Sequence, residues 1–101
     1  MHVIVDFTVV PVGTGVSLSR YIAVCEQVLE ARGLTHQLHA NGTNVEGEWD
    51  EVFAAIRDCH ERLHQMGVPR IHTDIKLGTR IDREQHMTDK VASVQKKPAD
   101  R

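Results

Sequence analysis

The chain has 101 residues, of which 41% are hydrophobic and 26% charged, and its formal net charge is -2. These values fit one globular domain with its own core and exclude the compositions typical of disorder. The 12 basic and 14 acidic residues nearly balance, so the composition shows no excess of positive charge for binding nucleic acid or an anionic membrane. We expect neither as a partner.

The apolar runs are far shorter than the roughly 20 residues that span a bilayer. The first residues also lack the basic segment, apolar segment and cleavage site of a secretory signal. We therefore predict a cytoplasmic location.

Residues 3–10, VIVDFTVV, alternate in a way that predicts a strand ending at Pro11. A turn-rich segment, PVGTGVS, follows. A helix then begins with Ser17 as its N-cap and stops at Gly33. GTGVS precedes the helix start, where backbone N–H groups can hold an anion, but no Gly-Lys-Ser/Thr follows, which favours a plain turn over a nucleotide site. The apolar side of the strand carries Val3, Val5, Phe7 and Val9.

The second half of the chain repeats this order. THQLHA (35–40) and TNVEGE (43–48) flank Asn41-Gly42, a dipeptide that accepts positive φ and predicts a tight hairpin. A second helix follows from Trp49 to Met66, ending at Gly67, and RIHTDIKL (70–77) predicts a fourth strand. Cys25 and Cys59 fall on the apolar sides of the two helices and are interpreted as core residues.

Two strand-helix-strand units joined by a hairpin give βαββαβ. Right-handed crossovers interleave them into an α+β, ferredoxin-like sandwich with a four-stranded antiparallel sheet and both helices on one face. We assign residues 1–80 to this domain and residues 81–101 to a polar C-terminal helix and frayed tail.

HERLH, residues 60–64, has the spacing of a helical zinc site, in which His60 and His64 share the ion and Glu61 polarises its water. At 100° per residue, however, both histidines fall at the edge of the apolar stripe and Glu61 faces solvent. Boundary histidines on an amphipathic helix are the better interpretation, with a zinc-dependent hydrolase as a remote alternative.

The sheet face without helices is predicted to be rich in hydrogen-bonding groups. If the apolar residues of the first strand face the helices, Asp6 and Thr8 point the other way. Polar groups in mid-strand need partners, so this face is either a subunit interface or a ligand site. The other candidates for it are Gln37, His39, Asn44, Glu46, His72, Asp74 and Lys76.

Three stretches together resemble the small YkoF-like thiamine-binding family: FTVVPVGTGVSLSRYIA, NGTNVEGEWDEVFAAI and GVPRIHTDIKLGTRID. The resemblance covers nearly the whole chain in order. It implies a ferredoxin-like fold, assembly into dimers or tetramers, and binding of thiamine or its hydroxymethylpyrimidine part, with no established catalysis. We expect no cofactor and no metal ion.

Thiamine carries a cationic thiazolium and a flat aminopyrimidine. A site for it needs a carboxylate, hydrogen-bonding groups in the pyrimidine plane and a wall to stack on. The carboxylate candidates are Glu46 and Asp6. The hydrogen-bonding candidates are Thr8, Thr43 and Asn44. Trp49 is a candidate stacking surface, although a cover for the edge of the core is the better interpretation of this ring.

The leading hypothesis is a non-catalytic binding protein for thiamine or hydroxymethylpyrimidine. The alternative is a structural or regulatory module whose open sheet face only assembles. Because both edge strands of such a sheet are exposed, we expect at least a dimer in either case.

Overall fold

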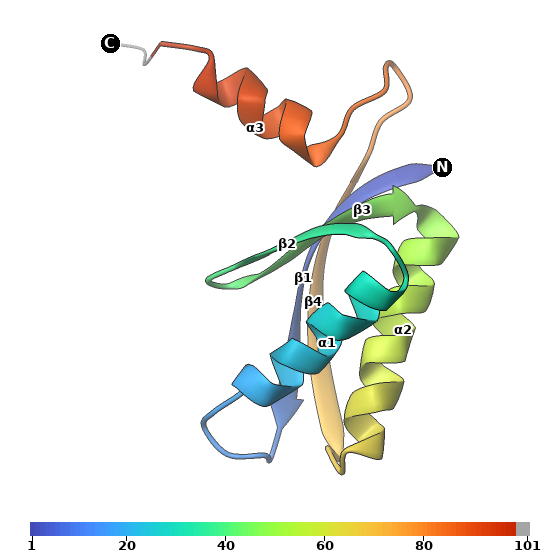
Figure 1. The fold of residues 1–101 in the computed structure, drawn as a ribbon, viewed down its shortest axis with the longest axis vertical. Helices are drawn as coiled ribbons and strands as arrows, with labels where there is room; N and C mark the ends of the chain where they lie inside the picture. The colour runs from blue at the N-terminus through green and yellow to red at the C-terminus, as the bar shows by residue number, and fades with distance from the viewer. Residues whose placement is uncertain (99–101) are drawn as a thin grey trace.

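The structure is a computed structural model and describes residues 1–98, so the last three residues of the predicted tail lie outside it. The four strands form one antiparallel sheet in the order β2-β3-β1-β4, with α1 and α2 on one face (Figure 1). This arrangement confirms the ferredoxin-like fold. The elements are β1 (His2–Val12), α1 (Ser19–Ala31), β2 (Thr35–His39), β3 (Gly42–Glu48), α2 (Trp49–Gln65), β4 (Arg70–Thr79) and α3 (Met87–Gln95).

The core lies between the sheet and the two helices. The alternation of β1 is confirmed, because its four predicted apolar residues are all buried there. Cys25 and Cys59 are free and buried in the same core, also as predicted. The other buried apolar side chains are Tyr21, Val28, Leu29, Val45, Val52, Ala55, Ile56, Leu63 and Val68.

The first strand is longer than predicted, since it continues through Pro11 to Val12. Proline lacks a backbone donor and is tolerated only where no ladder bond is needed. Beyond Phe7, β1 pairs with β4 alone, and Pro11 stands opposite Ile71. On its other edge this part of β1 has no neighbouring strand, so Pro11 interrupts no hydrogen-bond ladder there.

The start of α1 differs from the prediction. The N-cap position is Leu18, and no side chain caps the helix. Ser17 turns its hydroxyl toward that of Ser19, at 3.5 Å, and so does not cap the first turn. The predicted stop is confirmed, because Gly33 takes a positive φ of 67°.

The hairpin is present, but its turn is Ala40-Asn41 and not Asn41-Gly42. No non-glycine residue among those described has positive φ, and Gly42 does not have it either. Gly42 is required for another reason. A Cβ on it would lie 2.8 Å from Thr8 Oγ1 and 3.0 Å from the Phe7 carbonyl oxygen.

The C-terminal segment contains the helix α3, which extends away from the rest of the molecule (Figure 1). Its first residue touches the sheet face opposite α1 and α2, where the Met87 N–H donates to Glu46 at 3.1 Å. That face is therefore partly covered, contrary to the prediction that it is bare. We call it the open face below. No helix within residues 1–98 is long and apolar enough to cross a membrane.

Candidate functional site

A cleft of about 340 Å³ lies between the second half of β1, the start of α1 and the β2-β3 hairpin. We call it the hairpin cleft. Its volume is in the range of small-molecule sites, and most of its walls are apolar. It is lined by Phe7, Thr8, Val9, Val10, Leu18, Ile22, Cys25, Glu26, Leu38, His39, Ala40, Asn41, Gly42 and Thr43.

Two polar side chains meet inside this cleft. Thr43 stands opposite Phe7 in the sheet and therefore faces the helices, where it is only 4% exposed. Its hydroxyl donates to Glu26 Oε2 at 2.9 Å. A carboxylate and a hydroxyl set in apolar walls can recognise the polar edge of a flat ring while its faces are buried.

Sequence reasoning named Thr43 but missed Glu26. The signal was present, because Glu26 follows Ile22 by four residues and precedes Leu29 by three, which places it beside the apolar stripe of α1. A charged residue in that position needs a partner, and Thr43 supplies it.

The structure separates the predicted site residues. Asp6 and Thr8 lie on the open face, opposite to Thr43, and both are engaged with the hairpin. His39 Nε2 lies 2.9 Å from Asp6 Oδ1, and the Thr8 hydroxyl donates to the carbonyl of Asn41 at 2.8 Å. Thr8 also lines the rim of the hairpin cleft.

Asn44 and Glu46 share the open face with Asp6 but lie nearer to α3. Asn44 lines a shallow depression with Ile4 and Gln37 under the first turn of that helix. Glu46 is only 6% exposed, and its Oε2 has three neighbours: His2, His86 and the Met87 N–H.

Trp49 stands apart from the other candidates, at the first turn of α2. Its ring packs on Phe53, with 4.9 Å between ring centroids, and remains 37% exposed. This contact fits the interpretation of Trp49 as a cover for the edge of the core. The structure does not bring it to the hairpin cleft.

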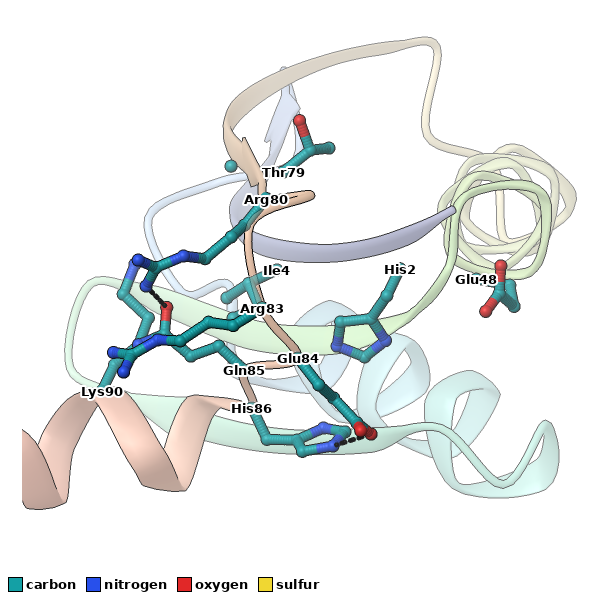
Figure 2. Close-up of a pocket in the computed structure, with 11 residues that line it drawn as sticks. His2, Ile4, Glu48, Thr79, Arg80, Arg83, Glu84, Gln85, His86 and Lys90 are labelled. Carbon is teal, nitrogen blue, oxygen red and sulfur yellow. Dashed lines mark hydrogen bonds and ion pairs between the residues drawn. The ribbon is translucent and has the colours of Figure 1, made fainter.

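A second, more polar cavity of about 490 Å³ lies where β1, β4 and the segment before α3 meet (Figure 2). We call it the terminal cavity. It is lined by His2, Ile4, Glu48, Gly78, Thr79, Arg80, Arg83, Glu84, Gln85, His86 and Lys90.

The residues of HERLH have structural partners. His60 lies 2.6 Å from the Thr73 hydroxyl, and His64 Nδ1 lies 2.7 Å from the carbonyl oxygen of Val68. Glu61 pairs with Arg57 on the solvent side of the helix. Burial and the neighbouring His64 lower the pKa of His60 below its usual value. These contacts fit boundary histidines, of which His60 joins α2 to β4 and His64 joins α2 to the loop that follows it.

The comparisons with known proteins agree with the fold. The family model described as thiamine-binding protein matches residues 5–95. A UPF0045 protein of Synechocystis is 56% identical over 95 residues, which cover 94% of this chain and 78% of that protein. A UPF0045 protein of Bacillus subtilis is 37% identical over 98 residues, covering 92% of this chain and 94% of that protein.

Two solved structures show the same architecture. A hypothetical protein of Methanocaldococcus jannaschii superposes with a TM-score of 0.86 at 26% identity, covering 93% of this chain and 96% of that one. A candidate thiamine biosynthesis/salvage protein of Thermotoga maritima superposes with a TM-score of 0.79 at 20% identity, covering 93% and 99%.

The fold and these matches define the class of the chain, which is a small ferredoxin-like α+β protein. It belongs to the thiamine-binding protein family, whose curated relatives carry the name UPF0045.

Proposed function

We propose that this protein binds thiamine or hydroxymethylpyrimidine without catalysing a reaction, and that the hairpin cleft holds the pyrimidine ring. Membership in the thiamine-binding protein family supports the ligand class. The observation that carries the location is the Glu26-Thr43 pair inside an apolar cleft.

The chemistry of the pair suits an aminopyrimidine. The exocyclic amine of the ring is a donor and the ring nitrogens are acceptors, so Glu26 can accept from the amine while Thr43 donates to a ring nitrogen. On binding, the Thr43 hydroxyl exchanges its present bond to Glu26 for one to the ligand. The carboxylate also favours a cationic ligand, because charge pairing is strengthened in a partly buried site.

The cleft walls supply the remaining recognition. Ile22, Leu38 and Phe7 offer apolar surface to the two faces of a flat ring. Leu38 is 53% exposed in the free chain, so a bound ring would remove apolar surface of the protein as well as its own from water.

The other predicted residues take outer positions in this proposal. Thr8 forms the rim of the cleft, and Asp6 lies just behind it on the open face. Asn44, Glu46 and Trp49 lie farther away and would reach the ligand only from a second copy of the chain. We accordingly propose a dimer or tetramer as the working form. The cytoplasmic location stays a prediction.

A non-catalytic role is supported by the contacts of HERLH. Each of His60, Glu61 and His64 has a neighbour that fits a structural role.

Calorimetry with hydroxymethylpyrimidine and thiamine tests the proposal. We expect Glu26→Gln and Thr43→Val each to weaken pyrimidine binding, the first by about 10- to 100-fold, because a hydrogen bond to a charged group contributes roughly 1.5–3 kcal/mol. Glu30→Gln, on the exposed side of the same helix, is the matched control and should bind like the unaltered protein. Equal losses in Glu30→Gln, or no heat with any pyrimidine, would contradict the proposal.

The assembly module remains a second candidate, because apolar side chains are exposed on the C-terminal segment. Ile81 and Val94 are 96% and 74% exposed. Sedimentation of the full chain and of Val91→Ser with Val94→Ser distinguishes the candidates. If the double variant sediments as a smaller species than the full chain, and calorimetry shows no binding of any pyrimidine, the result would support assembly alone.

A further inference from the structure

Three side chains from distant parts of the chain converge beside the terminal cavity. His2 comes from the start of β1, Glu46 from the middle of β3 and His86 from the residue before α3. His2 Nε2 lies 3.0 Å and His86 Nδ1 3.4 Å from the same atom, Glu46 Oε2. The ligating atoms of all three residues lie within 4.8 Å of one another.

The two separations that end at Glu46 Oε2 suit a metal ion. Zinc binds imidazole nitrogen and carboxylate oxygen at about 2.0–2.1 Å in a tetrahedron, which places two ligand atoms about 3.3 Å apart. The two distances to Glu46 Oε2 bracket that value. Two imidazoles and one carboxylate are also a ligand set that selects zinc and its neighbours over calcium or magnesium.

Hydrogen bonding alone leaves the carboxylate crowded. A carboxylate oxygen has two lone pairs. Glu46 Oε2 faces three donor-bearing groups, since the Met87 N–H is 3.1 Å away in addition to the two rings. A cation held by the rings and the carboxylate resolves this, because it leaves Met87 as the one donor.

A second carboxylate, that of Glu84, contacts the other ring nitrogen of His86. His86 Nδ1 faces Glu46, while its Nε2 lies 3.1 Å from Glu84 Oε1 (Figure 2). Histidines that bind metals regularly donate their other ring nitrogen to a carboxylate, which fixes the tautomer and makes the ligating nitrogen more basic. Glu84 has that position here.

The cavity leaves one side of the cluster open. Figure 2 shows His2 and His86 at one end of it and the cationic groups of Arg80, Arg83 and Lys90 at the other. Arg80 is paired with Asp82, with an Nη2 to Oδ2 distance of 2.7 Å, which reduces its repulsion of a cation.

We propose that His2, Glu46 and His86 form a binding site for a divalent ion of the zinc class, with the fourth position open to water or an exchangeable anion in the terminal cavity. The ion joins the first strand, the third strand and the start of α3, so it also fixes that helix to the open face. The site is separate from the hairpin cleft and does not depend on the proposed ligand.

Cobalt(II) is a suitable probe, because tetrahedral Co²⁺ with nitrogen and oxygen ligands absorbs strongly in the visible region. The chelator-treated full chain is titrated with Co²⁺, and the bound ion is then displaced with Zn²⁺. We expect one ion per chain and an intense tetrahedral spectrum. His2→Ala and His86→Ala should each weaken binding by more than about 100-fold, and Glu84→Gln by about 10-fold, since loss of an outer partner costs 10- to 100-fold.

The matched control is the double variant His60→Ala with His64→Ala, which removes the other close histidine pair of the chain. It should bind Co²⁺ like the unaltered protein. Circular dichroism establishes that each variant is folded, including His86→Ala, which changes the N-cap residue of α3. The proposal is overturned if binding is substoichiometric, if the spectrum is octahedral and weak, or if His60→Ala with His64→Ala loses the ion while His86→Ala keeps it.

Discussion

The two faces of the sheet stabilise the protein in different ways. The face under α1 and α2 is a continuous apolar core, in which Val3, Val5 and Val45 are completely buried. The open face carries polar side chains that have specific partners, such as Asp6 with His39 and Glu46 with His2. Residues of the two faces alternate along the same strands.

This difference separates stability from recognition. Burial of apolar side chains is non-directional and supplies most of the folding free energy. Polar contacts contribute little net stability but specify geometry, because a buried polar group without its partner is costly. The hairpin cleft lies at the boundary, where Glu26 and Thr43 bring polar chemistry into the apolar side.

The largest expected effect is a cavity in the covered side. Leu63 on α2 is fully buried, and Leu63→Ala should lower the free energy of unfolding by about 2–5 kcal/mol in a denaturant titration. Val16→Ala, in the exposed turn between β1 and α1, is the control and should change it by less than about 0.5 kcal/mol. Similar values for the two would remove the distinction between core and surface.

Gly42 tests how closely the hairpin approaches β1. A Cβ there would press on Thr8 Oγ1 and on the Phe7 carbonyl, so Gly42→Ala should cost about 1–3 kcal/mol of unfolding free energy. Gly78→Ala is the matched strand variant, because a Cβ at Gly78 meets nothing within 4 Å, and it should be neutral or slightly stabilising. A Gly42→Ala variant with unchanged unfolding free energy would contradict the steric explanation for this glycine.

A pH titration examines the contact between α2 and β4. Burial and His64 lower the pKa of His60 in the folded chain, so the neutral ring contributes stability above its ordinary pKa of 6.5 that is lost as pH falls toward the folded value. Proton NMR should show His60 titrating below the usual range, and His64→Asn should shift the pKa back upward. An ordinary value in the unaltered protein would contradict the packing of this ring.

The smallest expected effect concerns the solvent side of α2. Arg57 and Glu61 form an exposed pair one turn apart, and Arg57→Ala should cost no more than about 0.5 kcal/mol in the same denaturant titration. A loss above about 2 kcal/mol would show that Arg57 makes stabilising contacts beyond this exposed pair.

The sequence was sufficient to predict the βαββαβ order, the sheet face that α1 and α2 cover, and the two glycine helix stops. These follow from periods of two and of 3.6 and from local turn chemistry, as the burial of Val3, Val5, Phe7 and Val9 illustrates. The turn at Ala40-Asn41 was missed because the requirement for Gly42 comes from Thr8 and Phe7, which are far away in sequence.

The functional clusters were harder to predict for the same reason. Glu26 meets Thr43 only after α1 packs on the sheet, and His86 meets Glu46 only after the C-terminal segment folds back over the open face. Residue type alone marked Thr43 and Glu46 as polar positions in a strand. The alternation of β3 puts these two residues on opposite faces, and packing decides which cluster each belongs to.

Nuclear Overhauser effects from bound hydroxymethylpyrimidine test the central claim most directly. The account predicts contacts from the ring methyl group to the side chains of Ile22 and Leu38, with the largest amide shift changes near Glu26 and Thr43. Contacts confined to Asp6, Asn44 and Glu46 on the open face would contradict it.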